Sequence, residues 1–232
     1  MYYDFNVPIN GDDTLEDRLN FECRLGFKNF VISQIVSDPS ESLNVMKDLQ
    51  KVISNLKIKA YCKITLRTEE DFKIKRFLKL IRGKVDVLSI EPKTIQSLRL
   101  AGRDRRVDTI IVNDYNFKWL DRSQARLMRN SGTSIEVQIS RFIHDLTINR
   151  CVYVLNRILR FIETYRVPLV ISLGAKSMYE IKSPKQIIYT LRFLGLSKVS
   201  ALNSLTLTPK LIIDRSLHRR SSKHVAEGVD IL

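Results

Sequence analysis

Seven short apolar segments alternate with segments of helical periodicity along this sequence, and that alternation restricts the fold more than any other feature. In the helical segments the apolar residues fall on one face, as Leu43, Met46, Leu49 and Ile53 do. The expected strands are residues 2–7, 30–35, 58–66, 85–90, 109–112, 134–139 and 168–173. Repeated strand–helix units with short connections require parallel strands and right-handed crossovers, so we expect an α/β fold.

Two parallel architectures satisfy this repeat, an open doubly wound sheet and a closed barrel. The dinucleotide-binding sheet requires Gly-x-Gly-x-x-Gly after its first strand, where this chain has Val7-Pro8-Ile9-Asn10-Gly11. We therefore favour a TIM-barrel-like (β/α) repeat. It is expected to be incomplete or distorted, because seven strands are evident and 232 residues fall short of the roughly 250 of a complete barrel. Residues 1–209 form the expected barrel domain, and residues 210–232 form an expected basic C-terminal tail.

Capping signals indicate where the helices begin and end. Polar side chains that accept hydrogen bonds from a first helical turn stand at Thr14, Asp38, Thr68, Asp121 and Ser183. Glycines, which tolerate the left-handed conformation of a helix end, precede four expected strands at Gly26, Gly83, Gly102 and Gly132. Both signals agree with the strand–helix repeat.

Composition favours a cytoplasmic protein without a membrane partner. No apolar run reaches the ~18 residues of a membrane-spanning helix, and Asp4 interrupts the first apolar stretch. Cys23, Cys62 and Cys151 are odd in number and far apart in sequence, which suits neither a disulfide framework nor a clustered metal site. We expect them to be reduced, buried thiols.

Charge points to nucleic acid as the leading partner. The chain has 39 Lys and Arg against 25 Asp and Glu, a net charge of +14. Residues 1–50 carry four basic and nine acidic side chains, whereas residues 51–232 carry 35 and 16. An excess of this size attracts a polyanion. Two alternatives stay open, a basic surface that serves only solubility and an anionic membrane surface, although no basic amphipathic helix with an aromatic face supports the latter.

The C-terminal strand ends are where a barrel of this kind carries its chemistry. The polar residues expected there are Asp4, Asn6, Gln34, Lys63, Glu91, Asn113, Asp114, Gln138 and Lys176. Of the three histidines, only His144 falls near this face, in an expected loop over residues 140–150, so a hydrolytic metal site lacks ligands. Asp4, Glu91 and Asp114 could hold magnesium, which keeps a metal-dependent phosphoesterase as the alternative function. Strand-end carboxylates more commonly cap amides or pair with arginine.

Motifs for covalent or nucleotide chemistry are incomplete. Gly174-Ala175-Lys176-Ser177 lacks the earlier glycine of a phosphate loop, and no Gly-x-Ser-x-Gly elbow is present. We therefore assign no catalytic residue, metal ligand or cofactor to the chain. Tyr115, Phe117 and Trp119 could stack on bases, although packing is the commoner role of such aromatic residues.

Basic clusters remain as the candidate functional feature, because the arginine fork and the lysine point charge both bind phosphate. The expected RNA-binding residues are Arg99, Arg103, Arg105, Arg106, Arg141, Lys176, Lys182, Lys185, Arg219, Arg220 and Lys223. Arg122, Arg126 and Arg129 lie at helical spacing and are interpreted as solvated helix residues. A purely protein-binding scaffold is a third hypothesis, in which the arginines have no role in RNA binding.

Several segments, taken in order, resemble one known family. They are Tyr3-Asp4-Phe5-Asn6-Val7, Gly26-Phe27, Val170-Ile171-Ser172-Leu173-Gly174-Ala175, Ser183-Pro184-Lys185 and Leu194-Gly195-Leu196 through Ala201. With this order and spacing, the chain resembles the archaeal and eukaryotic ribonuclease P protein subunit with a TIM-barrel fold, called protein component 3 in archaea. The family usually shows Arg-Ser-Pro where this chain has Lys182-Ser183-Pro184, which keeps the charge but loses the fork.

The resemblance implies an RNA-bound accessory subunit of the ribonucleoprotein that removes 5′ leaders from precursor tRNA. The RNA component would be the catalyst, with magnesium expected for that RNA and no cofactor on this chain. The implied partners are ribonuclease P RNA, precursor tRNA and the other protein subunits, especially a small ferredoxin-like subunit. The family is similar to metal-dependent phosphoesterase barrels that carry Asp-x-His in the first strand, where this chain has Asp4-Phe5-Asn6.

Overall fold

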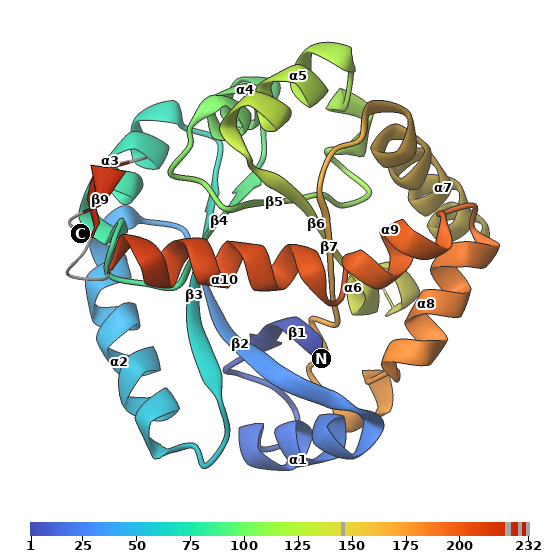
Figure 1. Cartoon of the computed structure of the whole chain (residues 1–232), viewed down its shortest axis with the longest axis horizontal. Helices are drawn as coiled ribbons and strands as arrows, with labels where there is room; N and C mark the ends of the chain where they lie inside the picture. The colour runs from blue at the N-terminus through green and yellow to red at the C-terminus, as the bar shows by residue number, and fades with distance from the viewer. Residues whose placement is uncertain (145–146, 221–223, 227–228, 231–232) are drawn as a thin grey trace.

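A computed structural model describes residues 1–144, 147–220, 224–226 and 229–230, and seven parallel strands within them form a nearly closed barrel (Figure 1). In sheet order these are β1 (Tyr2–Pro8), β2 (Phe27–Val36), β3 (Ala60–Thr68), β4 (Val87–Pro92), β5 (Thr109–Ile111), β6 (Ser134–Gln138) and β7 (Leu169–Ser172). Each falls on one of the seven expected segments. The prediction of an incomplete TIM-barrel-like fold is confirmed.

Helices surround the strands in the order that the repeat predicts (Figure 1). They are α1 (Leu15–Leu25), α2 (Ser42–Asn55), α3 (Asp71–Ile81), α4 (Ile95–Arg103), α5 (Arg122–Ser131), α6 (Ile139–His144), α7 (Ile148–Tyr165), α8 (Pro184–Phe193), α9 (Lys198–Asn203) and α10 (Leu207–Arg219). Three short 3₁₀ helices lie in loops, at η1 (Pro39–Glu41), η2 (Phe117–Trp119) and η3 (Met178–Glu180). Strands β8 (His224–Ala226) and β9 (Val229–Asp230) form a separate antiparallel pair.

Neighbouring residues of several strands enter two separate cores. Ile32 and Cys62 belong to the large cluster between the strands and the surrounding helices. Their neighbours Val31 and Tyr61 belong to a second cluster with Tyr3, which also contains Phe5, Val87 and Val170. Because successive side chains of a strand point to opposite faces, this second cluster fills the inside of the barrel.

Helix α10 closes the N-terminal end of the barrel, crossing in front of the strands in Figure 1. Its Ile212 and Ile213 are 3% and 1% exposed and belong to the inner cluster. The expected tail boundary after residue 209 therefore falls inside a packed helix. Residues 210–220 are part of the barrel unit, which corrects the expectation of a tail that begins at residue 210.

Arginines from α10 neutralise carboxylates at this end of the barrel. Arg215 and Arg219 lie 3.2 and 3.3 Å from Oδ1 of Asp108, which is 1% exposed. Arg220 pairs with Asp86. The other oxygens of the two carboxylates accept backbone N–H groups from β4 and β3, at Leu88 and Cys62. The aspartates thus join the strand ends to α10.

No eighth strand fills the gap between β1 and β7 in the part of the chain described here. The turn between α9 and α10 supplies carbonyl groups there instead, since the Tyr3 N–H donates to Leu205 and the Ile171 N–H donates to Ser204, at 2.9 and 3.1 Å. Toward the C-terminal end, the Gly174 N–H donates to the Asn6 carbonyl at 3.0 Å. These bonds close the barrel without a continuous ladder.

Most of the expected helix boundaries are present. Thr14 and Asp121 cap α1 and α5, Asp38 caps η1, and Ser183 with Gln186 forms a capping box at α8. Gly26 and Gly132 end α1 and α5 in the left-handed conformation. Gly83 also has positive φ, just after α3.

Two boundary predictions are wrong. Glu70 rather than Thr68 occupies the cap position of α3, and the Thr68 hydroxyl accepts the Glu70 N–H. Gly102 lies within α4, where an added Cβ would stand 2.1 Å from Nε2 of Gln124. Close packing of α5 against α4, rather than a helix end, explains this glycine.

Two further expectations concern the cysteines, as reduced and buried thiols, and the lack of a membrane-spanning segment. All three cysteines are free, with Cys62 and Cys151 buried and Cys23 half-buried. Burial raises the pKa of Cys62 to about 12. Among the described residues, no helix has the length and apolar character needed to cross a membrane.

Truncating Ile213 tests whether α10 is part of the core. Ile213→Ala is expected to lower the free energy of unfolding by about 2–5 kcal/mol, because it opens a cavity inside the barrel. Leu211 of the same helix is 58% exposed, so Leu211→Ala should change the free energy of unfolding by less than about 0.5 kcal/mol. Urea denaturation followed by circular dichroism measures both. Equal effects of the two substitutions would contradict the packing of α10.

Candidate functional site

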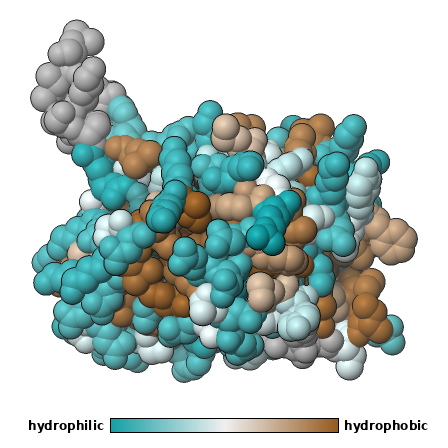
Figure 2. Space-filling view, turned by 90° about the horizontal axis from the view of Figure 1, so that it is seen from below, coloured by the Kyte–Doolittle hydropathy of each residue, from teal (hydrophilic) through white to brown (hydrophobic). Residues whose placement is uncertain are grey.

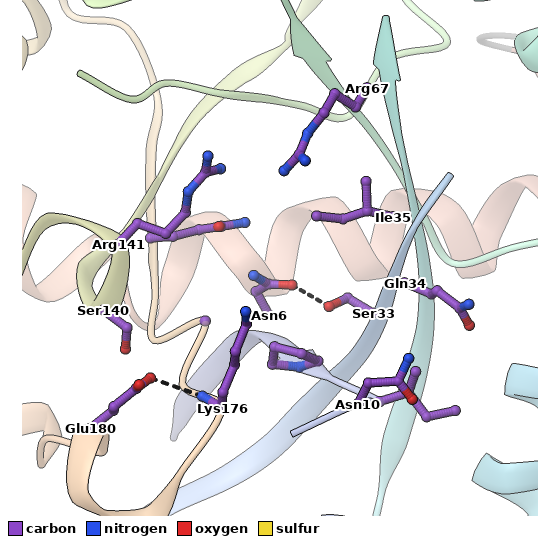
Figure 3. A pocket seen from close by; sticks show the side chains of 14 residues that line it. Asn6, Asn10, Ser33, Gln34, Ile35, Arg67, Ser140, Arg141, Lys176 and Glu180 are labelled. Atoms are coloured by element: carbon purple, nitrogen blue, oxygen red, sulfur yellow. Dashed lines mark hydrogen bonds between the residues drawn. The ribbon is translucent and has the colours of Figure 1, made fainter. Parts of the chain in front are cut away.

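The C-terminal mouth of the barrel holds a cavity of about 530 Å³ (Figure 3). It is lined by the ends of β1, β2, β3 and β6, the start of α6, and the loop after β7. The lining residues are Asn6, Pro8, Ile9, Asn10, Ser33, Gln34, Ile35, Arg67, Gln138, Ser140, Arg141, Gly174, Lys176 and Glu180. This is the end of the barrel where the sequence analysis expected the functional side chains.

Two arginines at the cavity share one buried carboxylate. Glu91, at the end of β4, accepts Nε and Nη2 of Arg67 at 3.0 and 2.9 Å and Nη1 of Arg141 at 3.0 Å. The Glu91 side chain is 5% exposed, against 35% for Arg67 and 30% for Arg141. The Asn113 amide also donates to Glu91, at 3.2 Å. Glu91 therefore fixes both guanidinium groups at the mouth.

Uncharged polar groups form another part of the wall. The Ser33 hydroxyl donates to Oδ1 of Asn6, which leaves the Asn6 amide nitrogen as a donor. Ser140 is 4% exposed, and its hydroxyl has no hydrogen-bond partner among the described residues. Gly174 has a positive φ of 66°, and a Cβ there would come within 3.3 Å of the Asn6 amide nitrogen.

A buried arginine braces the loops that border the cavity. Arg18 of α1 donates to the carbonyl oxygens of Ala175 and Pro8, at 2.9 and 2.7 Å. These carbonyls belong to the loop after β7 and to the end of β1. Burial lowers the pKa of Arg18, and Glu22 opposes that shift.

The side chain of Asp4, in β1, faces Glu22 of α1 rather than the mouth. Its Oδ1 accepts the backbone N–H groups of Asn6 and Leu173, at 3.1 and 3.0 Å. If both carboxyl groups were ionised, Oδ2 of Asp4 and Oε2 of Glu22 would be buried without a hydrogen-bond donor. Burial raises the pKa of Asp4, and burial together with Asp4 raises the pKa of Glu22 well above its usual range. A proton held by Glu22 would satisfy both oxygens.

Lys63, expected at a strand end, is instead fully buried in the middle of the barrel. Its Nζ lies 2.6 Å from Oε2 of Glu136 and 3.2 Å from the Phe5 carbonyl. Glu136 also accepts the hydroxyls of Thr109 and Ser172, at 2.9 and 3.0 Å. Burial lowers the pKa of Lys63, and the Glu136 carboxylate opposes that shift by favouring the charged amine. This network fills the barrel below the cavity with polar groups that satisfy one another.

The carboxylates of the phosphoesterase alternative do not form a metal site. Asp4 serves backbone amides and Glu91 binds two arginines, as described above. Within the described residues, no group of three or more His, Cys, Asp and Glu is arranged to hold a metal ion. His218 lies on α10, and the side chains of His144 and His224 lie outside the described residues.

The predicted RNA-binding residues separate between the two ends of the barrel. Arg141 and Lys176 line the cavity, and Lys182 and Lys185 follow Lys176 along the chain toward α8. Figure 3 shows Arg141 and Lys176 on the side of the cavity formed by α6 and the β7 loop. The structure thus brings part of the expected set together at the mouth.

The remaining predicted residues lie elsewhere. Arg219 and Arg220 are on the α10 side, and Arg105 and Arg106 lie in the α4–β5 turn, where their carbonyls accept hydrogen bonds from Arg82. Arg106 also pairs with Asp104, and Arg103 ends α4 on the surface. Arg99 pairs with Asp121 in the outer helical layer. Lys223 lies outside the described residues.

The aromatic residues after β5 form a packed cluster. Tyr115 and Trp119 meet edge to face with ring centroids 5.2 Å apart, and Phe117 and Tyr153 meet likewise at 6.2 Å. The Arg150 guanidinium lies over the Phe117 and Tyr153 rings. Phe117 and Trp119 pack against the main core, which agrees with the packing interpretation.

Sequence reasoning missed Arg67, Ser140 and Arg18. Arg67 lies four residues after the inward-facing Lys63, so the period of two could have placed it on the same inward face of β3. No local pattern marks Ser140, whose role depends on the shape of the cavity. Arg18 reads as an ordinary polar residue of an amphipathic helix.

Comparisons with known proteins assign the family. The sequence model described as RNase P subunit p30 matches residues 1–221. The chain belongs to this family. The resemblance found in the sequence is thereby confirmed, over nearly the whole chain.

Relatives of this p30-family chain carry the name ribonuclease P protein component 3. The one from Methanosarcina barkeri is 26% identical over 239 residues, covering 100% of this chain and 95% of the relative. The one from Methanococcoides burtonii is 24% identical over 249 residues, covering 99% and 93%.

Solved structures share the fold. A chain of archaeal ribonuclease P with mature tRNA matches with a TM-score of 0.80 and 22% identity, over 99% of this chain and 97% of that one. Histidinol phosphate phosphatase from Lactococcus lactis, complexed with zinc, L-histidinol and phosphate, matches with a TM-score of 0.51 and 10% identity over 93% of each chain. Both likenesses concern the barrel architecture.

The shared proton of Asp4 and Glu22 predicts a pH dependence of stability. Because the pKa of Glu22 is higher in the folded state than its ordinary value of 4.5, its contribution to stability is full below that value. The contribution is lost as the pH rises through the folded-state pKa. Glu22→Gln keeps a donor to Asp4 without titrating, so its free energy of unfolding should rise relative to wild type above pH 4.5.

Urea denaturation from pH 4.5 to pH 8 measures this difference. Glu16→Gln, on the exposed side of α1, is the matched control and should follow the wild-type curve. Parallel curves for wild type and Glu22→Gln would show that Glu22 is ionised in the folded protein.

The Lys63–Glu136 pair predicts a strong asymmetry between single and double substitution. Lys63→Met leaves a buried carboxylate without its cation and is expected to cost about 3–5 kcal/mol of unfolding free energy. Lys63→Met combined with Glu136→Leu removes both charges and should recover part of that loss, because the buried hydroxyls of Thr109 and Ser172 then lose their acceptor. Chemical denaturation of the four proteins of the cycle measures the coupling, and additive effects would contradict it.

Proposed function

We propose that this chain is a non-catalytic, RNA-binding subunit of ribonuclease P that supports removal of 5′ leaders from precursor tRNA. The observation that carries the proposal is the p30-family match over residues 1–221 in a chain with a net charge of +14. In this proposal the RNA component performs the cleavage and binds the magnesium that it needs. The partners are ribonuclease P RNA, precursor tRNA and other protein subunits.

Charge compensation favours the C-terminal end of the barrel as the RNA-binding end. At the opposite end, Arg82, Arg215 and Arg219 converge on the buried Asp108. By contrast, Lys176, Lys182 and Lys185 form no salt bridge with described residues, and the Lys182 amine donates to a carbonyl, that of Tyr179, at 3.2 Å. The amines of these lysines are available to phosphates, whereas the arginines at the opposite end help to hold α10 against the strands.

Exposed apolar side chains support a protein partner as well. Tyr189 and Phe193 lie one turn apart on α8 and are 65% and 89% exposed, and Val199 on α9 is 67% exposed. Figure 2 shows that apolar side chains on the face in view gather in patches within a largely hydrophilic surface. Clustered aromatic residues of this exposure are typical of protein contacts. We propose the small ferredoxin-like subunit as that partner, because the family implies it.

Paired lysine substitutions test the RNA-binding end. Lys176→Ala with Lys182→Ala is expected to weaken binding of ribonuclease P RNA and to reduce the log–log salt slope by roughly 1.5, since each lost phosphate contact contributes about 0.7–0.9. Filter binding across a salt series measures the slope. Cleavage of precursor tRNA by the reconstituted enzyme should fall in parallel.

Lys47→Ala with Lys51→Ala removes the same charge from exposed positions on α2 and serves as the control. This pair should leave the salt slope close to that of wild type. If both pairs reduce binding equally, the C-terminal end has no special role in RNA binding. If the affinity of the wild type does not depend on salt, the proposal of RNA binding itself is contradicted.

A further inference from the structure

The arginines at the mouth are built to accept a ligand with several oxygen atoms. Each guanidinium carries five N–H donors, and the bonds to Glu91 use two of those of Arg67 and one of those of Arg141. Because Glu91 is buried behind them, the two forks are held in place before any ligand arrives. Lys176 adds a third positive charge to the lining, and Glu180, which accepts the Lys176 backbone N–H at 2.9 Å, adds one negative charge.

Ser140 supplies an independent sign that a ligand belongs there. Its hydroxyl is buried, lines the cavity and has no hydrogen-bond partner among the described residues. A buried hydroxyl without a partner costs free energy, which a bound acceptor would recover. The Asn6 amide nitrogen lines the same space, with its oxygen already engaged by Ser33.

The wall of the cavity opposite Arg141 consists of apolar side chains and the side-chain amides of Gln34 and Asn10. Figure 3 shows Ile35 and Gln34 across the space from Arg141, with Asn10 below them. Pro8 and Ile9 complete this wall. Such a surface suits a planar ring that carries hydrogen-bonding groups at its edge.

We propose that the cavity binds one phosphate-bearing nucleotide unit. The phosphate lies among Arg67, Arg141, Lys176 and the Ser140 hydroxyl, and the nucleoside lies against Pro8, Ile9 and Ile35. The nucleotide belongs to a single-stranded part of the RNA, an assignment that rests on the proposed function. A free mononucleotide presents the same chemistry, so the experiment separates the two sources.

Isothermal titration of the full chain with 5′-AMP tests the pocket. Arg141→Lys keeps the charge but loses the fork, and its affinity for AMP should fall about tenfold relative to wild type. Ser140→Ala should reduce the affinity roughly threefold to tenfold while leaving the melting temperature unchanged, because its hydroxyl has no partner in the free protein. Adenosine, which lacks the phosphate, should bind at least tenfold more weakly than AMP.

Lys47→Ala, which removes a charge from an exposed position on α2 outside the cavity, is the control and should keep wild-type affinity for AMP. A single-stranded RNA hexamer should displace AMP from wild type but not from a site that takes only free mononucleotides. Wild-type affinity in Arg141→Lys and Ser140→Ala, or no AMP binding by wild type, overturns the pocket. Ribonuclease P RNA binding in the filter assay would still stand in that case, so failure of the pocket is distinct from failure of the proposed function.

Discussion

Closure of the barrel between β1 and β7 is the constraint on which the rest of the structure depends. Seven strands leave these two edges without a mutual ladder, so their backbone groups need other partners. The Ser204 and Leu205 carbonyls serve at one end, and the Asp4 carboxylate and Asn6 carbonyl serve at the other. The Asp4 carboxylate therefore accepts hydrogen bonds from backbone N–H groups of both edges, and it faces Glu22. The first-strand carboxylate that a metal-dependent mechanism would need at the mouth is committed to closing the barrel.

The two ends of the barrel use the same residue types for opposite purposes. At the N-terminal end, several arginines neutralise the buried Asp108, and the strands are covered by the apolar face of α10. At the C-terminal end, one buried carboxylate, Glu91, holds two half-exposed arginines. The first arrangement holds α10 against the strands, whereas the second holds two arginines at the edge of a cavity.

Local features of the fold could be predicted, because strand composition, the helical period and the caps at Thr14 and Asp121 depend on neighbouring residues. The features that were missed depend on contacts between distant segments. Helix α10 looked like the start of a tail because residues 215–224 contain no acidic side chain, while Asp108, the partner of Arg215 and Arg219, lies more than 100 residues earlier in the chain. Gly102 looked like a helix stop because Gln124, which packs on it, is invisible to a local pattern. The period of two could place Arg67 on the inward face of β3, but only the closed barrel brings it together with Arg141 at Glu91.

Glu91 shows how a single side chain changes meaning between sequence and structure. Taken alone, a carboxylate at a strand end is a candidate ligand for a cation. Placed between Arg67 and Arg141, it carries one negative charge against two positive ones, so the group as a whole attracts anions. The carboxylate also orients both guanidinium groups. In a solvent-exposed arginine pair without such a partner, ordering the two side chains would cost entropy when the ligand binds. In the proposed site, Glu91 thus lowers the net positive charge but holds both arginines in order, and its removal would leave more charge there and less order.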